Sequence, residues 1–322
     1  MIGKIDQRDL EELVFTRTGN ADPAVIQGPA YGEDTAAIDL GEHILVINAD
    51  PLSMAAEDVG TLAVHVACND IAASGATPRW ITNTMFLPEA DRSVLDTVTA
   101  QVDSAAREIG VAIVGGHAEV TPDISRPLLS MAAFGVTDRY IPSGGASPGD
   151  RIILAGGAGI EATAILAEDF GGELRERGID EAVLDRAAAF VEEISVVDAA
   201  LAVREFASAM HDPTEGGVLS GLLEMAVASG VTFEVNRENI PVRSETRRCC
   251  SVMGVDPLCV FGSGGLLVAV PPVDGTTALQ ALVDEGVEAA DIGHVTAGDG
   301  TVRLDGEEHA QAPRDELYPL WE

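Results

Sequence analysis

A segment rich in helix and strand breakers divides this 322-residue chain nearly in half. Residues 141–150 read Ile-Pro-Ser-Gly-Gly-Ala-Ser-Pro-Gly-Asp and lie between two apolar stretches. Because Pro and Gly disfavour the interiors of helices and strands, such a segment is typical of a connection between folded units. We therefore expect two domains, residues 1–146 and 147–322, each long enough to bury a core of its own.

Apolar patterning on both sides of this segment predicts mixed secondary structure. Alternating or continuous apolar runs predict strands over residues 43–48, 79–86, 111–114, 128–136, 151–154 and 266–270. Apolar residues spaced three and four apart predict helices over residues 59–74, 92–109, 160–170, 181–194, 196–210 and 218–228. No repeat of fixed period is present. The expected fold class is α+β, built from two α/β-type domains.

The charge balance limits the partners of this chain. It has 53 acidic and 19 basic residues, a formal net charge of −34, and Lys4 is its only lysine. Acidic residues spread over all segments are typical of a halophilic surface, because molar salt with a Debye length of about 3 Å screens their repulsion. With no basic stripe, binding to nucleic acid is excluded. ATP would need divalent cations between two polyanions, so carboxylates and Mg²⁺ are expected at any nucleotide site.

Several other classes are disfavoured. No apolar run is long enough to span a bilayer, and the N-terminus lacks the layout of a secretory signal, so we expect a cytoplasmic protein without a membrane partner. The four cysteines have no metal-ligand spacing and are expected as reduced thiols. A P-loop is excluded because the only lysine is at position 4. The segment 156–159 lacks the third glycine of a dinucleotide fingerprint, which makes a dehydrogenase a distant alternative.

The stretch from Asp212 to Gly217, Asp-Pro-Thr-Glu-Gly-Gly, precedes an expected helix. The proline restrains Asp212 to an extended backbone, Thr214 can cap the helix, and the paired glycines allow another group to approach the main chain. Two interpretations follow from these residues. One is an ordinary helix start, and the other is a site for a metal-bound phosphate.

Other acid-bearing segments occur in a similar setting, beside small residues at the edges of apolar stretches. They are Glu33 and Asp34 before a strand, Asp50 at a strand end, Asn69 and Asp70 within an apolar helix, and Gly115, Gly116, His117 and Glu119 after a strand. Each segment has a plain structural alternative: a turn, a strand terminator, an exposed helix face or a tight bend. Asn69 and Asp70 are flanked by apolar neighbours that leave only a narrow face for water.

Taken in order, these segments resemble a known superfamily. It contains aminoimidazole ribonucleotide synthetase (PurM), thiamine monophosphate kinase, selenophosphate synthetase and the hydrogenase maturation protein HypE. The segments Asn-Asp-x-Ala-x-Ser-Gly-Ala-x-Pro, from Asn69, and Asp-Pro-Thr-x-Gly-Gly, from Asp212, are most similar to HypE. The resemblance implies a PurM-like N-terminal domain that pairs with a second subunit into a dimeric β-barrel, and a PurM C-terminal-like second domain. It also implies a homodimer with ATP bound along the N-terminal domain.

The same resemblance implies roles for individual residues. The implied metal ligands are Asp34, Asp50, Asp70 and Asp212. The implied nucleotide or phosphate contacts are Glu33, Asp34, Asn69, Asp70, Gly115, Gly116, His117, Glu119 and Thr214. His117 stands where relatives carry an acid, which implies a γ-phosphate contact or acid–base role, and with Asp212 it forms the implied catalytic pair.

The implied chemistry is Mg²⁺-dependent use of ATP to activate an acceptor oxygen, such as that of an amide or carbonyl, by phosphorylation. The alternatives are a small-molecule kinase like thiamine monophosphate kinase and a non-catalytic ATP-binding assembly or regulatory dimer. HypE proteins end in a Pro-Arg-x-Cys tail, whereas this chain ends in Tyr-Pro-Leu-Trp-Glu and no cysteine follows Cys259. We therefore expect a HypE-like paralogue that acts on a separate small-molecule or protein substrate, which no residue of the sequence identifies.

Overall fold

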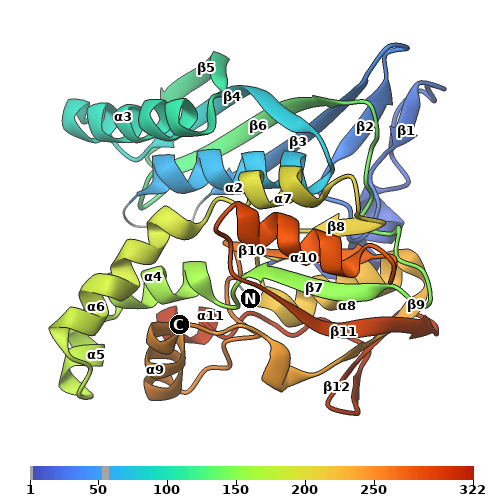
Figure 1. Ribbon diagram of the computed structural model, residues 1–322. Helices are drawn as coiled ribbons and strands as arrows, with labels where there is room; N and C mark the ends of the chain where they lie inside the picture. The colour runs from blue at the N-terminus through green and yellow to red at the C-terminus, as the bar shows by residue number, and fades with distance from the viewer. Residues whose placement is uncertain (1–2, 53–57) are drawn as a thin grey trace.

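The computed structural model describes residues 3–52 and 58–322, which form two sheets with helices between them (Figure 1). The N-terminal sheet has six strands in the order β1-β2-β3-β6-β4-β5, all antiparallel except the parallel pair β4 and β5. Its strands are β1 (Val25–Gln27), β2 (Ala36–Asp39), β3 (Ile44–Leu52), β4 (Thr77–Leu87), β5 (Ala112–Val120) and β6 (Leu128–Thr137).

One face of this sheet is covered by helices. Burial alternates strictly along β6, so that Leu129, Met131 and Ala133 are buried while the residues between them are half-buried. The buried set belongs to the same core as α2 (Val59–Ala73) and α3 (Arg92–Ile109). A period of two along a strand separates a core face from an open face. The half-buried residues of β6 therefore mark the open face of the N-terminal sheet.

The C-terminal sheet has seven strands in the order β13-β12-β9-β11-β7-β10-β8, antiparallel except for the pair β12 and β9. Its strands are β7 (Arg151–Gly156), β8 (Ala209–His211), β9 (Val231–Val235), β10 (Gly265–Val270), β11 (Ala289–Ala297), β12 (Thr301–Leu304) and β13 (Glu307–His309). Helix α8 (Gly217–Ser229) covers one face, and α7 (Val197–Val203) and α10 (Gly275–Asp284) lie on the other (Figure 1). All six residues of β10 are buried, as expected for a strand covered on both faces.

Shorter elements complete the described chain. They are α1 (Gln7–Asp9), a π-helical turn (Leu10–Val14), α4 (Ile160–Asp169), α5 (Gly171–Glu176), α6 (Glu181–Ala188), 3₁₀ turns at Ala189–Glu193 and Arg237–Asn239, α9 (Ser244–Met253) and α11 (Tyr318–Trp321). Helices α4, α6 and α9 contact one another beside the C-terminal sheet. Within the described ranges, no helix has both the length and the apolar character needed to cross a membrane.

The two halves share a core and are tied by polar contacts. Ile71 of α2, Ala200 of α7 and Val268 of β10 belong to one continuous cluster of buried side chains. Asn69 of α2 donates from Nδ2 to the Ile194 carbonyl at 2.9 Å. Its Oδ1 accepts from the main-chain N–H of Val196 at 2.8 Å. Two buried hydrogen bonds with good geometry fix α2 against the start of α7.

The connection over residues 141–150 is packed firmly. The Glu33 carboxylate accepts hydrogen bonds from the Tyr140 hydroxyl at 3.0 Å, the Ser143 N–H at 3.2 Å and the Gly144 N–H at 3.1 Å. A Cβ on Gly145 would lie 2.0 Å from the Ser208 carbonyl oxygen, so glycine is required there for close approach. The breakers in this segment thus allow tight packing between the halves.

Most elements predicted from apolar periodicity are confirmed, and α3 matches its predicted bounds at both ends. The prediction of a helix over residues 196–210 is wrong in its second part. There α7 ends at Val203, and β8 forms because residues 209–211 pair with β10. The predicted helix over residues 181–194 is α6 followed by a 3₁₀ turn.

Two predicted strands end too early. Strand β3 continues through Asp50 to Leu52, because β6 pairs with it along its whole length. Strand β5 continues to Val120, because β4 provides a parallel partner for the residues after Gly115. The prediction that Asp50 ends a strand and the alternative reading of Gly115 and Gly116 as a tight bend are therefore wrong. Neighbouring strands, which the local sequence does not reveal, decide both ends.

We predict that Gly135→Ala destabilises the protein. A Cβ on Gly135 of β6 would lie 2.3 Å from Ile71 Cγ2 of α2 and 2.9 Å from the Thr77 carbonyl oxygen. Overpacking of this kind should lower the free energy of unfolding by about 1–3 kcal/mol, measured by denaturant titration in molar KCl. Gly172→Ala in α5, where a Cβ meets nothing within 4 Å, is the matched control and should leave the stability equal or slightly higher. Equal stability of both variants would contradict the packing of α2 on β6.

Candidate functional site

Three carboxylates from distant parts of the chain meet between the two sheets. Asp34 precedes β2, Asp70 lies in the last turn of α2, and Asp212 follows β8. One oxygen from each lies within 4.8 Å of the other two. Asp70 and Asp212 are buried, at 3% and 2% exposure, whereas 40% of the Asp34 side chain is exposed. The fold thus joins three of the predicted metal ligands into one cluster, which we call the carboxylate cluster.

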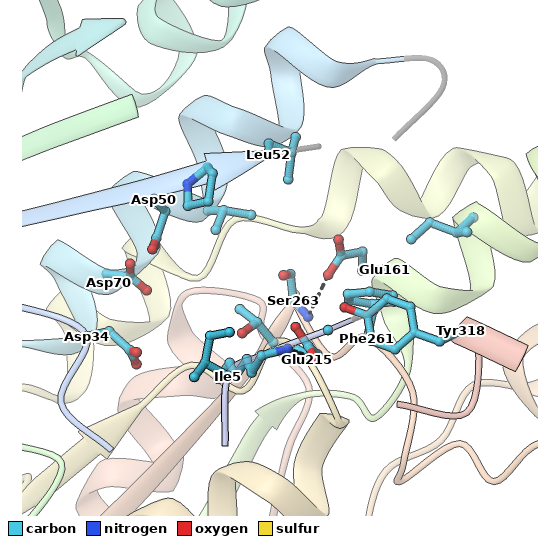
Figure 2. A pocket seen from close by; sticks show the side chains of 16 residues that line it. Ile5, Asp34, Asp50, Leu52, Asp70, Glu161, Glu215, Phe261, Ser263 and Tyr318 are labelled. Carbon is cyan, nitrogen blue, oxygen red and sulfur yellow. Dashed lines mark hydrogen bonds between the residues drawn. The ribbon is translucent and has the colours of Figure 1, made fainter. Parts of the chain in front are cut away.

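The carboxylate cluster stands at one end of a cavity of about 440 Å³ between the two halves of the chain. Figure 2 shows Asp34, Asp50 and Asp70 at this end, and Glu161, Ser263 and aromatic side chains at the other. Thr214 also lines the cavity, as do residues 3–5 of the N-terminal segment. A cavity of this size with polar groups at both ends can hold a phosphate-bearing ligand and an acceptor together.

The charges of the cluster are poorly compensated by the protein alone. Burial raises the pKa of Asp70 well above its usual range, and the nearby carboxylates of Asp212 and Asp50 raise it further. Burial also raises the pKa of Asp212 to about 7, although His211 opposes the shift. Asp212 Oδ2 is buried and has no hydrogen-bond partner in the described part of the chain. Converging oxygens with a buried unpaired acceptor among them fit a hard divalent cation such as Mg²⁺.

Asn48 of β3 orients the cluster. Its Nδ2 donates to Asp70 Oδ2 at 2.7 Å and lies 3.4 Å from Asp50 Oδ2, while its Oδ1 accepts from the Ala133 N–H at 3.0 Å. Asn69, which the family resemblance implies as a nucleotide or phosphate contact, directs its amide to main chain at the start of α7. Asn48 was not among the predicted site residues, because in the sequence it stands only at the end of an apolar strand. An amide among buried strand residues is the feature that could have revealed it.

A chain of ion pairs runs behind Asp34. His211 Nδ1 lies 3.4 Å from Asp34 Oδ2, and its Nε2 lies 2.9 Å from Glu224 Oε2 of α8. Glu224 Oε1 in turn lies 3.2 Å from the Lys4 ammonium. Although burial opposes it, the contacts with Glu224 and Asp34 raise the pKa of His211 to about 9. The only lysine of the chain thus helps to compensate the acidic centre, a role that sequence reasoning missed.

The start of α8 is not capped as the sequence predicted. Thr214 makes no cap, because the helix begins at Gly217 after Gly216, and both glycines have positive φ, of 65° and 77°. The Gly216 N–H instead donates to Asp315 Oδ2 at 2.9 Å. Asp315 is buried, and burial raises its pKa to about 7. A carboxylate 99 residues away in the sequence therefore holds the loop that carries Asp212.

The residues of β5 that were predicted to contact the nucleotide lie away from the carboxylate cluster within one chain. His117 and Glu119 are exposed on β5, with 3.2 Å between Nε2 and Oε2. The strand order β3-β6-β4-β5 puts them three strands away from Asp50. A Cβ on Gly116 would lie 2.2 Å from the Asn83 carbonyl oxygen of β4, so this glycine serves the contact between strands. Nucleotide contacts for these residues stay predictions.

Two family models match the chain. The N-terminal domain of AIR synthase related protein matches residues 32–137, and its C-terminal domain matches residues 147–305. This chain belongs to the AIR synthase related family. The membership confirms the expected PurM-like superfamily and the fold of two mixed α and β domains.

Individual relatives within the AIR synthase related family are similar over most of their length. Carbamoyl dehydratase HypE of Rhizobium leguminosarum bv. viciae is 33% identical over 285 residues, which cover 83% of this chain and 78% of that protein. The crystal structure of hydrogenase maturation protein HypE in complex with ATP matches with a TM-score of 0.66 and 26% identity, covering 95% and 93% of the two chains. AaThiL complexed with AMPPCP and TMP matches with a TM-score of 0.74 over 90% and 92%, but at 22% identity this likeness shows the fold alone.

We predict that metal and proton compete for the carboxylate cluster. With a pKa of about 7 against the ordinary 3.8, Asp212 holds a proton more tightly in the folded protein than in the unfolded chain. In EDTA its contribution to stability is therefore complete below about pH 4 and is lost as the pH rises through about 7. At low pH the thermal midpoint of the Asp212→Asn variant should equal that of wild type. Above pH 7 the midpoint of the variant should be higher, by roughly 2 °C for each kcal/mol of stability that wild type loses. Mg²⁺ should then stabilise wild type more than the variant.

Identical behaviour of the variant and wild type would contradict this role of Asp212. If Asp212→Asn and wild type show the same midpoints at every pH in EDTA, and Mg²⁺ raises both equally, the buried carboxylate neither binds the metal nor carries the proton. Differential scanning calorimetry at constant KCl makes the comparison, because the Debye length then stays fixed across the series.

Proposed function

We propose that this protein is an ATP- and Mg²⁺-dependent enzyme of the HypE type, which phosphorylates an oxygen of an amide, carbonyl or related acceptor. The observation that carries the proposal is the carboxylate cluster at one end of the cavity. The similarity to carbamoyl dehydratase HypE and to the ATP complex of HypE supports it. With so few basic groups in the chain, carboxylates that hold a cation are the available means of binding a polyphosphate.

In this proposal Asp34, Asp70 and Asp212 would hold Mg²⁺, with Asp50 beside them, and Asn48 orients Asp70 through its hydrogen bond. A bound Mg²⁺ would neutralise the phosphate charge that builds up during transfer. The γ-phosphate then faces the cavity, where the acceptor oxygen forms a bond to phosphorus as the bond to the ADP oxygen breaks. ADP leaves with that electron pair. The enclosing walls position the two reactants and limit the access of water.

We further propose that the protein acts as a homodimer through its N-terminal sheet. Every residue of the edge strand β5 is exposed, including Ile113, Val114 and Val120 at 45%, 57% and 50%. A long exposed apolar edge is usually paired or covered. On this arrangement Gly115, Gly116, His117 and Glu119 lie at the subunit boundary, where His117 can meet the γ-phosphate or act as acid or base in the partner's site. The barrel implied by the family resemblance belongs to this proposal.

We predict that Asp212→Asn and Asp70→Asn each lower the affinity for ATP in the presence of MgCl₂ by at least about tenfold. Isothermal titration calorimetry in molar KCl measures the affinity, and omission of MgCl₂ should weaken binding to wild type similarly. Asp103→Asn, an exposed residue of α3 paired with Arg107, is the matched control and should bind as wild type does.

Turnover is the second readout of this proposal. With cell metabolites as the acceptor pool, the Asp212→Asn variant should release ADP roughly 100-fold more slowly than wild type. Equal affinity for ATP and equal ADP release in wild type and both variants would contradict the assignment of Asp70 and Asp212 to the ATP site. Tight binding of ATP by wild type with no turnover on any pool would instead favour the non-catalytic dimer.

We predict that the protein has twice the chain mass of 33.4 kDa in solution and that Val114→Asp makes it monomeric. A charge in the middle of an apolar edge opposes its burial in an interface. Val273→Asp, at a site 84% exposed between β10 and α10, is the control and should remain dimeric. Light scattering after gel filtration in molar KCl measures the mass, and a Val114→Asp dimer as stable as the control would place the interface elsewhere.

A further inference from the structure

Another pocket, of about 570 Å³, lies where β4 begins and β6 ends. Its walls are the residues around these two strand ends, together with Arg204 and Glu205, which follow α7. Helix α7 contacts α2 at the junction of the two halves (Figure 1). Among the described residues, none lines both this pocket and the cavity that holds the carboxylate cluster. The function proposed above therefore leaves this pocket unused.

The pocket gathers positive charge in a chain that has little of it. Arg79, Arg139 and Arg204 all line it, and they are three of the chain's 19 lysine and arginine residues. We call it the arginine pocket. Asp138 and Glu205 are the two acids of its wall, so its formal charge is three positive minus two negative, or +1, with His neutral. The chain as a whole carries −34.

The two acids of the wall point largely to solvent. The Asp138 side chain is 86% exposed and lies 2.8 Å from His43 Nδ1. The Glu205 side chain is 79% exposed, and its Oε1 lies 3.8 Å from Arg204 Nε. Exposed charges in water compensate a neighbouring charge weakly, because the high dielectric reduces their interaction. The arginines thus keep most of their attraction for an anion.

Arg139 and Arg204 are held by neutral acceptors from the opposite half of the chain. Arg139, after β6, donates from Nη1 to the Glu205 carbonyl at 3.5 Å and from Nη2 to the Ala207 carbonyl. Arg204, after α7, donates from Nη1 to Thr77 Oγ1 at 3.3 Å. These reciprocal contacts position both guanidinium groups without neutralising them. Because a guanidinium has five N–H donors, each retains donors for a ligand.

Arg79 is held without an acid as well. Its Cζ lies over the Trp80 ring, 4.6 Å from the centroid, which is a cation–π contact. Among the described residues, no carboxylate lies within ion-pair distance of Arg79 or Arg139. Elsewhere arginines do pair with acids, as Arg303 does with Glu234 at 2.9 Å. In a chain with 53 acidic residues, arginines that line a pocket without such a partner are available to an external anion.

The arrangement fits a compact anion with more than one charge. Guanidinium groups pair with phosphate and carboxylate oxygens through two parallel hydrogen bonds. A carboxylate presents two oxygens in one plane, whereas the tetrahedral phosphate group presents oxygens to several walls at once. A long polyanion such as nucleic acid is disfavoured, because the acidic surface around the pocket would repel it.

We propose that the arginine pocket binds a phosphate group, either as inorganic phosphate or as a phosphomonoester. Arg79, Arg139 and Arg204 donate to its oxygens. Because Arg139 belongs to the N-terminal half and Arg204 to the C-terminal half, the bound anion bridges the two. This binding requires neither Mg²⁺ nor ATP and is independent of the proposed function.

Calorimetric titrations of the full-length protein test the ligand. Inorganic phosphate, phenyl phosphate and acetate are titrated at about pH 8, where phosphate carries close to two charges, in molar KCl with EDTA. The Debye length of about 3 Å screens long-range attraction, so binding reports direct contacts. At least one of the two phosphates should bind about tenfold more tightly than acetate. The tighter of the two identifies the free anion or the ester as the ligand.

Two variants test the residues. Arg79→Gln and Arg139→Gln should each weaken phosphate binding at least about tenfold, because a charge-assisted hydrogen bond is lost. Arg79 makes no hydrogen bond among the described residues, so its variant keeps the inference testable if Arg139→Gln fails to fold. Arg107→Gln in α3, at a residue paired with Asp103, is the matched control and should bind phosphate as wild type does.

The remaining outcomes separate this inference from the proposed function. Absence of phosphate binding to wild type, acetate binding as tight as that of both phosphates, or unchanged binding in both pocket variants would overturn the inference. Asp212→Asn should bind phosphate as wild type does, and a loss in that variant would place the anion at the carboxylate cluster and overturn the inference too. Because Mg²⁺ and nucleotide are absent, these failures leave ATP binding untouched, and loss of ATP binding leaves the phosphate result standing.

Discussion

The structure depends on keeping three carboxylates together where two of them have almost no contact with water. Isolated charges in such a place are costly, and mutual repulsion adds to that cost. The protein compensates with Asn48, which donates to Asp70, and with His211, which stands between Asp34 and Glu224. Much of the surrounding architecture, including the position of the only lysine, serves this compensation. In the proposed function, a bound divalent cation would add further compensation at the centre.

A site of this kind requires a rigid seam, because its ligands come from both halves of the chain. The shared core that joins α2, α7 and β10 provides most of that rigidity. Asn69 adds two buried hydrogen bonds, and Glu33 fastens the connecting segment with three. These two residues were predicted from motif resemblance as phosphate contacts. In the described chain their polar atoms hold the two halves in place, so they would influence the chemistry through geometry.

Much of the fold was predictable because it depends on local periodicity. Helix α3 has a strong apolar stripe and was predicted at its true ends, and the alternation along β6 fixed both its type and its core face. Predictions failed where pairing decides the outcome. The residues from Gly115 to Glu119 continue β5 only because β4 lies alongside, and residues 209–211 form β8 only because β10 accepts them. Such partners lie far away in the sequence.

The sequence by itself determined which residue types are available for chemistry. Its order of acidic motifs and its near absence of lysine indicate a cation-assisted phosphate site, because residue type fixes charge and ligand preference. The tertiary structure decided which acids come together. It brought Asp34, Asp70 and Asp212 within 4.8 Å, and it left His117 three strands away. It also revealed Glu161 at the opposite end of the cavity. Carboxylates are alike in a sequence, and only burial, neighbours and distance distinguish those that converge on one point from those that tie segments of the chain together.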